Sequence, residues 1–291
     1  MTNSGPTTRT PRRDVDSRAV PILMYHALGT RAAPGFSRFT LHPRLFAKHM
    51  ALLAHRGCRT LTVTQVMELR AQGAACPPGS VVLTFDDGYA DFHDQALPVL
   101  NKYGFTATLY VTTGHVGGIA TWTCADENGD RPMLSWSQLA EVTAAGIEIG
   151  AHSHTHPELD MLSPLEIREE VTRSRGELTD RLGVPVTSFA YPFGYFSRVV
   201  TEAVADAGFA SACTVKELAW DPGSEFLTVP RLSVTGGTEV ATLQRLLETV
   251  PTARSRQVAE AKRLLWQAWR RRPRRQSSPA GIDLAAGGVC S

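Results

Sequence analysis

The sequence predicts a parallel α/β fold, and its number of units fits a closed barrel better than an open doubly wound sheet. Three observations carry this prediction. Short apolar, β-branched runs alternate with helical patterns along the chain. Strands joined through crossover helices run parallel. Six or seven such units occupy about 230 of the 291 residues, although the pattern alone leaves closure of the sheet open.

The elements follow one another in a regular order from about residue 20. The runs expected to form strands are rich in β-branched, apolar and aromatic residues and lie within 19–26, 80–88, 107–114, 147–153, 186–194 and 210–215. The segments expected to form helices lie within 43–57, 95–104, 137–146, 163–183 and 201–208. Gly146 ends the third of these helices, as glycine commonly does. Strand and helix therefore alternate through most of the chain.

The two ends of the chain differ in composition from its centre. Residues 1–19 are rich in Thr, Pro, Arg and Asp without periodicity, so we expect a disordered arm. Residues 20–250 are expected to form the single domain. Residues 251–275 predict a basic amphipathic helix, and residues 276–291 predict a disordered tail. The fold is thus one domain with flexible termini.

Charge is distributed unevenly between these segments. The formal net charge is +2, yet residues 254–275 contain nine basic side chains and one acidic side chain, a charge of +8. Residues 20–253 contain 17 basic and 24 acidic side chains, a charge of −7, which argues against nucleic-acid binding. The basic helix is expected either to pack on the domain or to contact anionic lipid at the inner membrane face.

Targeting signals are absent from the sequence. Residues 1–20 contain no apolar run of the kind found in a signal peptide, and no stretch approaches the roughly 20 apolar residues that span a bilayer. The five cysteines are scattered without a CxxC pair, which suits reduced thiols. We therefore expect a cytoplasmic protein, with peripheral membrane contact through residues 254–275 as a further possibility. The sequence does not indicate the oligomeric state.

Two adjacent carboxylates follow the strand expected within 80–88. Asp86 and Asp87 come directly after its apolar run and precede Gly88. Adjacent acids at a strand end repel each other unless a cation or a division of roles separates them. Functional groups also gather at the carboxyl ends of parallel strands. The pair therefore indicates a functional site, with a capped turn before a helix as the structural alternative.

Three histidines follow the strand expected within 147–153. His152, His154 and His156 stand at alternate positions, so at least two imidazoles can converge on one point. Two histidines and one carboxylate from elsewhere form the usual three-ligand zinc site with an open position. We therefore expect a divalent metal ion here, with a solvated histidine run as the alternative. His154 competes with His156 as the second ligand.

Other candidates follow other expected strands. The run 189–195 combines aromatic residues with proline and glycine, which suits a sugar ring but also an ordinary core. His26 ends the first strand, and Arg231 lies in the apolar run 229–234. Each of these two residues, taken alone, is more often structural than functional. Loop residues that are candidates to line a substrate groove are Trp122, Asp126 and Trp136.

Taken together, these motifs resemble the NodB-homology polysaccharide deacetylases, carbohydrate esterase family four, from about residue 21 to residue 234. TFDDG resembles the family's first motif, which implies that Asp86 is the catalytic base and Asp87 a metal ligand. HSHTH resembles the second motif, which implies His152 and His156 as the other ligands. PILMYH and FAYPFG are similar to the poly-N-acetylglucosamine deacetylase branch, which implies an incomplete (β/α)7 barrel.

The resemblance also implies an activity, the metal-dependent hydrolysis of N-acetyl groups on a carbohydrate such as an N-acetylglucosamine-type glycan or precursor. A divalent ion, zinc before others, would activate water. Asp86 would accept the proton of that water, the backbone N–H of Phe193 would stabilise the oxyanion, and His26 would protonate the leaving amine. The sequence departs from the family at Ala190, where many members carry Arg, and no L-x-L-H follows Arg231. Arg231 is a candidate to replace the missing arginine beside Asp86.

Two other functions are compatible with the same residues. An amidase for a small cyclic or ureido compound would use the same site, because members of this superfamily have lost sugar specificity. A non-catalytic carbohydrate-binding relative would retain the fold without turnover. Acetate release from N-acetylglucosamine oligomers, compared with release from simple amides, separates these alternatives. The sequence does not identify the sugar.

Overall fold

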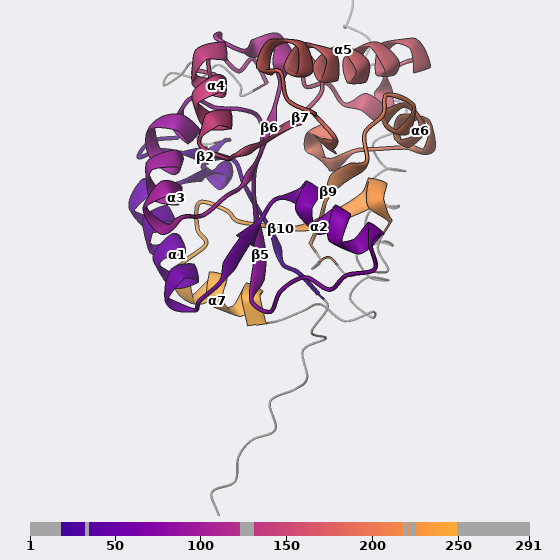
Figure 1. Cartoon of the computed structure of the whole chain (residues 1–291). Coiled ribbons are helices and arrows are strands. Elements are labelled where there is room, and N and C mark those ends of the chain that lie inside the picture. Colours follow the sequence, from indigo (N-terminus) through magenta and orange to yellow (C-terminus); the bar gives the residue numbers. More distant parts are fainter. Residues whose placement is uncertain (1–18, 33–34, 123–130, 218–219, 221–224, 249–291) are drawn as a thin grey trace, which may run out of the picture. The chain divides into compact units, whose positions relative to one another are not determined.

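Seven parallel strands form a closed barrel in a computed structural model that describes residues 19–32, 35–122, 131–217, 220 and 225–248 (Figure 1). In order around the ring they are β1 (Ile22–Tyr25), β10 (Val229–Ser233), β9 (Ser211–Glu217), β8 (Ser188–Ala190), β7 (Glu148–Ala151), β6 (Thr108–Val111) and β5 (Ser80–Phe85). The ring closes where β1 pairs with β5, from Ile22 opposite Val82 to Tyr25 opposite Phe85. The predicted barrel is therefore confirmed, and the open sheet is excluded.

Short strands extend this barrel at two places. β4 (Arg59–Leu61) pairs with the first half of β5, and β6 pairs with the second half of the same edge. β2 (Ala27–Leu28) and β3 (Thr40–Leu41) form a small parallel sheet of their own. Because β2 begins immediately after His26, this small sheet lies next to the carboxyl end of β1.

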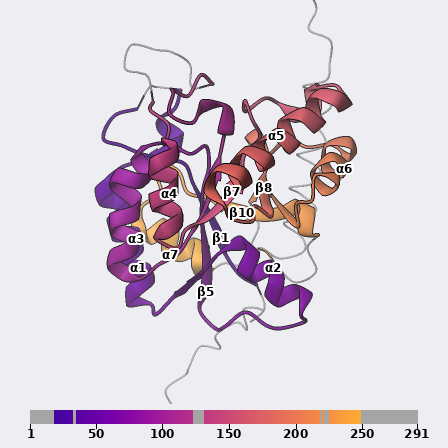
Figure 2. The ribbon, with the colours of Figure 1, turned by 45° about the horizontal axis from the view of Figure 1, so that its top comes forward.

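Helices lie around the strands, as Figures 1 and 2 show from two directions. They are α1 (Pro43–His55), α2 (Val63–Ala71), α3 (Leu97–Tyr103), α4 (Trp136–Ala144), α5 (Pro164–Leu182), α6 (Arg198–Asp206) and α7 (Val240–Glu248). Each crossover returns the chain to the same end of the barrel, so the carboxyl ends of its strands meet on one face. Residues that follow different strands are thereby brought together.

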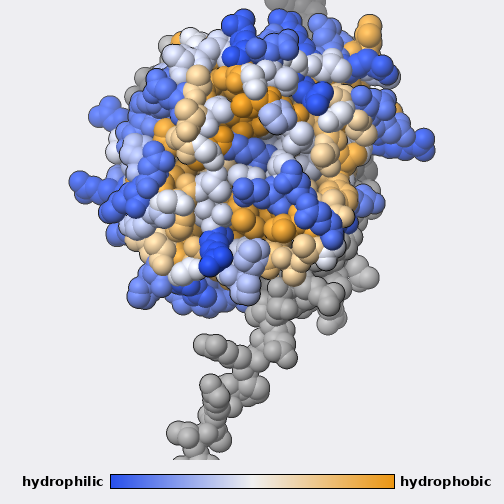
Figure 3. Space-filling model, viewed as in Figure 1, coloured by the Kyte–Doolittle hydropathy of each residue, from blue (hydrophilic) through white to orange (hydrophobic). Residues whose placement is uncertain are grey.

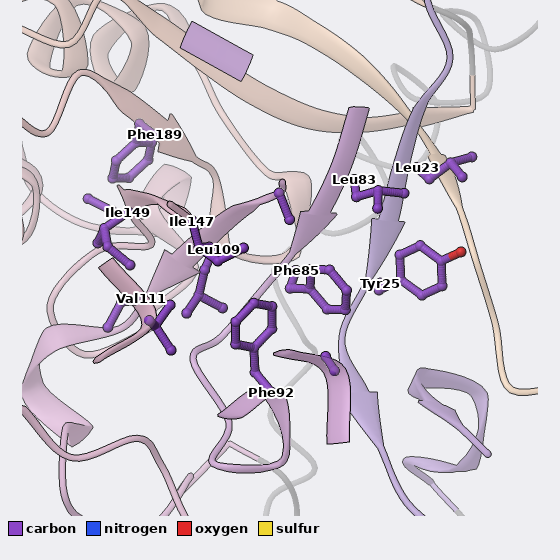
Figure 4. Packing of buried hydrophobic residues seen from close by; sticks show 14 of the residues in the cluster. Leu23, Tyr25, Leu83, Phe85, Phe92, Leu109, Val111, Ile147, Ile149 and Phe189 are labelled. Atoms are coloured by element: carbon purple, nitrogen blue, oxygen red, sulfur yellow. The ribbon is translucent and has the colours of Figure 1, made fainter. Parts of the chain in front are cut away.

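The buried side chains separate into an outer and an inner set. Leu23, Leu83 and Phe85 belong to one buried cluster with apolar side chains of the surrounding helices. Figure 4 shows these three side chains with Phe92 and with side chains of other strands of the same cluster. Ile22 and Val82 belong instead to a second buried cluster, together with side chains of other strands. Because side chains alternate along a strand, even-numbered residues of β1 and β5 face the barrel interior and odd-numbered residues face the helices.

Helix starts are marked by capping residues in the sequence. A capping box precedes each of α2, α4 and α5, formed by the pairs Thr62 with Gln65, Ser135 with Gln138, and Ser163 with Glu166. The apolar pattern did not indicate α2, whose buried residues are few, although the capping pair that marks its start is present in the sequence. The elements expected from the sequence include neither α7 nor β10.

The exposed large hydrophobic side chains of the described residues all lie at or after the carboxyl ends of barrel strands. They are Phe39, Ile119, Met161, Leu165, Phe193, Val199 and Val215. In the space-filling view, hydrophilic side chains surround the outline of the molecule and hydrophobic ones are exposed mainly nearer the middle (Figure 3). In the part of the chain that is described, no helix is both long and apolar enough to cross a membrane.

The predicted segments at the ends of the chain lie outside the described residues. This applies to residues 1–18 of the expected arm, to the expected helix 251–275 and to the expected tail 276–291. The domain boundaries, the membrane contact through residues 254–275 and the cytoplasmic location therefore stay predictions.

Candidate active site

A cavity of about 330 Å³ lies among the loops that follow the carboxyl ends of the strands. Six of the seven residues assigned from the sequence line it: His26, Asp86, Asp87, His152, His156 and Phe193. The seventh, Arg231, is fully buried and contacts Asp86. The structure thus brings together residues that follow five different strands or lie within them.

Asp86 continues the inward-facing series of β5. Val82 and Thr84 precede it at alternate positions, and the Thr84 hydroxyl donates to the carbonyl oxygen of Leu23. The Arg231 guanidinium binds Asp86 through two bonds, from Nη1 to Oδ1 at 2.6 Å and from Nη2 to Oδ2 at 2.8 Å. Such a bidentate pair fixes the plane of the carboxylate.

Arg231 is held in turn by barrel groups around it. Its Nε donates to the carbonyl oxygen of Thr214 at 3.1 Å, and its Nη1 also lies 3.2 Å from the Thr84 hydroxyl. Burial raises the pKa of Asp86, but the charge and hydrogen bonds of Arg231, together with His152 and His26, bring this pKa below its ordinary value. Burial lowers the pKa of Arg231, but Asp86 reverses that effect and raises it. Both groups are therefore charged at neutral pH.

Asp87 faces the two histidines of the second motif. Its Oδ1 lies 3.2 Å from Nε2 of His152 and 3.2 Å from Nε2 of His156. All three side chains are buried, and one ligand atom from each lies within 4.8 Å of the other two. Burial raises the pKa of Asp87, whereas hydrogen bonding to the two histidines lowers it well below its ordinary value. The carboxylate is therefore ionised.

These three residues fit a divalent metal ion. Nδ1 of His152 lies 2.8 Å from the carbonyl oxygen of Ala190, which only accepts, so this nitrogen carries a proton. When the ring is neutral, Nε2 is then the nitrogen with the free lone pair, so a cation between it and the Asp87 carboxylate would be bound by both. Zinc ligands at about 2.1 Å in tetrahedral geometry stand about 3.4 Å apart. The observed separations of 3.2 Å match that spacing.

Strained backbone is concentrated at this site. Among the described residues, positive φ occurs at four that are not glycine: Asp87 at 77°, Ser153 at 62°, His156 at 62° and Phe193 at 57°. Each such residue costs about 1 to 3 kcal/mol and persists only where its surroundings enforce it. In a regular strand Asp87 would face the helices like Phe85, so the left-handed turn is what redirects it toward the histidines.

His26 lies beside Asp86 in the cavity. Its Nε2 is 4.0 Å from Oδ2 of Asp86, and its ring contacts that of Phe39 at a centroid distance of 4.9 Å. Burial lowers the pKa of His26 and outweighs the raising effect of the two aspartates. The ring lines the cavity, so a bound substrate can reach it.

His154 points away from the metal site. Its Nδ1 lies 2.8 Å from the Thr113 hydroxyl and 4.0 Å from a carboxylate oxygen of Glu177. The structure therefore groups His156, and not His154, with Asp87 and His152.

Aromatic residues form much of the cavity wall. Phe193 contacts His156 edge to face at 4.7 Å, and Tyr195 stacks on Phe193. Trp122 also lines the cavity, as the sequence analysis suggested for a loop residue without a readable motif. Trp136 does not: it lies at the start of α4, under the guanidinium of Arg181. Phe36, Phe39 and Arg38 line the cavity too and were not anticipated, since nothing in their sequence context marks them.

Comparisons with known proteins agree with this site. The family model described as polysaccharide deacetylase matches residues 74–212. YxkH of Bacillus subtilis, named as a polysaccharide deacetylase, is 27% identical over 218 residues, which are 75% of this chain and 72% of the relative. The poly-beta-1,6-N-acetyl-D-glucosamine N-deacetylase of Staphylococcus aureus is 26% identical over 199 residues, 65% of this chain and 66% of the relative.

A solved structure resembles the whole barrel. IcaB from Ammonifex degensii superposes with a TM-score of 0.68 at 25% identity, covering 80% of this chain and 98% of that chain. Sequence, fold and the buried Asp-His-His group therefore agree. This chain thus contains a polysaccharide deacetylase domain, which the family model matches over residues 74–212.

Proposed function

We propose that this protein removes N-acetyl groups from an N-acetylglucosamine-type glycan or precursor, with zinc held by Asp87, His152 and His156. The observation that carries the proposal is the division between two adjacent carboxylates. Asp86 is bound by Arg231, and Asp87 faces two histidine nitrogens. One carboxylate is thereby available for proton transfer while the other serves as a ligand.

When bound, a divalent cation lowers the pKa of water and polarises the acyl carbonyl. Asp86 accepts a proton from the water whose oxygen attacks the carbonyl carbon, and Arg231 holds that carboxylate in its plane. The backbone N–H of Phe193 stabilises the negative charge that develops on the carbonyl oxygen.

The carbon–nitrogen bond then breaks, and the leaving nitrogen needs a proton. His26 supplies it, and because Asp86 holds the water's proton only 4.0 Å from the His26 ring, the same proton can reach the amine. The products are acetate and a free amino sugar. No other proton source is required, so the step balances with one water consumed.

The substrate class is supported by the cavity wall and by relatives. Phe36, Phe39, Trp122, Phe193 and Tyr195 offer aromatic faces suited to a sugar ring. The Staphylococcus aureus relative is named for the deacetylation of poly-beta-1,6-N-acetyl-D-glucosamine. The complete set of base, ligands and supporting arginine argues against a non-catalytic role for this chain.

Acetate release tests the proposal directly. The purified protein is incubated with N-acetylglucosamine oligomers, nucleotide-linked N-acetyl sugars, simple acetamides and cyclic ureido compounds, each with and without a chelator. We expect release from N-acetylated sugars, loss of release with the chelator and recovery when Zn²⁺ is restored. Hydrolysis of simple amides or ureido compounds alone would support the amidase. Tight metal binding without release from any of these compounds would indicate a non-catalytic protein.

A further inference from the structure

The two histidines of the metal site are held by different interactions. His152 is anchored by a hydrogen bond from its Nδ1 to the carbonyl oxygen of Ala190 at 2.8 Å. His156 has no such anchor: its Nδ1 is buried, and no described protein group lies within hydrogen-bond range of it. A metal-binding histidine ordinarily donates its second ring nitrogen to a carbonyl, carboxylate or water, which fixes the ring orientation. Among the described residues, something other than a hydrogen bond must orient His156.

The ring of Trp122 lies flat against His156. Their centroids are 4.3 Å apart and their planes differ by 19°, which is a stacked arrangement. The edges of His152 and Phe193 close the His156 ring from other directions, at 4.9 and 4.7 Å. Trp122 is thus the ring that stacks face to face with the imidazole, whereas His152 and Phe193 meet it in T-shaped arrangements. Its centroid distance is also the shortest of the three.

We propose that Trp122 is a positioning residue for the metal ligand His156, whose Nδ1 has no hydrogen-bond partner among the described residues. The inference rests on the proposed metal site, because it assigns to Trp122 the orientation of one of the three ligands. Stacking prevents the His156 ring from rotating away from Asp87 while leaving Nε2 free to bind. The backbone is fixed separately, since the His156 N–H donates to the Ser153 hydroxyl at 3.0 Å.

Trp122 is itself held on more than one side. His115 meets it edge to face at a centroid distance of 5.0 Å, and the Nδ1 of His115 lies 3.1 Å from the carbonyl oxygen of Ile119. The ring of Tyr89 lies 6.5 Å away on another side. A stacking partner that is packed in this way can restrain the ring that it covers.

Tyr89 connects this contact to a partly buried ion pair. The Arg131 guanidinium lies over the rings of both Phe36 and Tyr89, at 5.1 and 5.3 Å, and Nη1 of Arg131 binds Asp91 at 2.7 Å. Rings and guanidinium thus form a continuous packed group from Asp91 to Trp122. The indole is therefore packed against protein side chains other than the metal ligands.

Metal affinity tests the proposal without any need for turnover. We would compare Trp122→Leu, which retains apolar bulk but no ring, with Trp122→Phe, which retains a stacking face. Trp136→Leu is the matched control, because Trp136 packs under Arg181 at 4.7 Å and does not line the cavity. Zinc affinity is measured by competition with a chromophoric chelator, and ligand geometry by the visible absorption of the Co²⁺-loaded protein.

We expect Trp122→Leu to weaken zinc binding about 10- to 100-fold, the usual effect of losing a group that orients a ligand, and to change the Co²⁺ spectrum. Trp122→Phe should restore affinity to within about 3-fold of the unchanged protein, and Trp136→Leu should stay within the same limit. Wild-type affinity and spectrum in Trp122→Leu would overturn the proposal. So would a loss in Trp122→Phe, or in Trp136→Leu, as large as that in Trp122→Leu.

Two further measurements separate this inference from the metal site itself. His152→Ala in the same titration must lose zinc, and if it binds normally the metal site is wrong, whatever Trp122 does. Unfolding of each metal-free variant defines the temperature range in which all of them are folded, and affinities are compared within that range. A folded Trp122→Leu protein with normal zinc binding, beside a His152→Ala protein that binds none, would refute the role of Trp122 alone.

Discussion

The buried negative charges of Asp86 and Asp87 are stabilised in different ways. Both carboxylates are buried at 3% exposure, adjacent in sequence and ionised. Asp86 has a permanent cation, the guanidinium of Arg231, which belongs to the barrel. Asp87 has two imidazoles, which are good metal ligands but uncertain sources of charge. The charge of Asp86 is balanced by an arginine of the protein, whereas the charge of Asp87 is available to bind a metal cation.

The side chains of Asp86 and Asp87 point in different directions because their backbone conformations differ. Asp86 continues the regular alternation of β5 and reaches the interior, where Arg231 lies. Asp87 leaves that alternation through a left-handed conformation at φ 77° and turns toward the loop that follows β7. In a regular strand these neighbouring residues would face opposite sides. Here both of them line the same cavity.

His152→Ala should have the largest effect on metal binding and activity. It removes one of the three proposed metal ligands, and, among the described residues, Asp87 has no arginine beside it to balance its charge. We expect loss of stoichiometric metal and of acetate release together. Metal content by atomic absorption and acetate release are measured on the same preparation. Retention of one equivalent of tightly bound zinc would show that the metal does not depend on this histidine.

Arg231→Gln should remove the ion pair with Asp86 and leave metal binding unchanged. Removing one partner of a buried ion pair costs about 3 to 5 kcal/mol of stability, which denaturant unfolding at pH 7 would measure. The exposed pair of Arg198 with Glu202 offers a control, because Arg198→Gln should change stability by less than about 1 kcal/mol. Equal effects of the two substitutions would contradict the buried pairing.

The same Arg231→Gln variant should change the pH dependence of activity. Without the guanidinium, the largest effect that opposes burial is lost, so the pKa of Asp86 rises. Since Asp86 acts as a base only when ionised, activity is lost as the pH falls through its pKa. The acidic limb of the kcat/KM profile should therefore move to higher pH in the variant. An unchanged limb would mean that another group controls it.

His26→Gln tests proton delivery to the leaving group. We expect kcat for an N-acetyl sugar to fall about 100-fold, the lower range for loss of a general acid. An aryl acetate has a leaving group that departs without a proton, so its hydrolysis should fall by less than about 3-fold. Equal losses for amide and ester would assign His26 a role in binding or in the first step.

His154→Ala should have the smallest effect on the site. His154 contacts Thr113 and lies apart from Asp87, so its loss should cost about 1 kcal/mol of stability and leave zinc affinity unchanged within about 2-fold. Isothermal titration with zinc measures the affinity. A loss comparable to that in His152→Ala would make His154 the ligand and contradict the arrangement described here.

Much of the fold could be predicted because local patterns and long-range topology agree. Apolar runs such as that of β5 alternate with helical segments, and crossover rules leave few arrangements for the strands. The alternation of strands and helices favours a closed barrel without requiring it, since closure depends on the pairing of β1 with β5, which lie more than 50 residues apart. The helix α2 was missed because its few apolar residues give a weak pattern, although its capping pair was readable.

The candidate site was predictable where residues form motifs and unpredictable where they come from loops. Asp86, Asp87, His152 and His156 are found in two short runs, and the structure groups the last three as one cluster. Trp122 could be named only as a loop residue, because its stack on His156 depends on how separate loops pack. Phe36 and Arg131, which support that packing, carry no local signal at all.

The central claim, that two adjacent aspartates have separate roles, is tested most directly by one paired measurement. Asp86→Asn and Asp87→Asn make the same chemical change one residue apart, and zinc content and acetate release are measured on each protein. We predict that Asp86→Asn retains one equivalent of zinc while acetate release falls at least about 100-fold, and that Asp87→Asn loses both. An active Asp86→Asn protein, or an Asp87→Asn protein that binds zinc as tightly as the unchanged chain, would contradict the account.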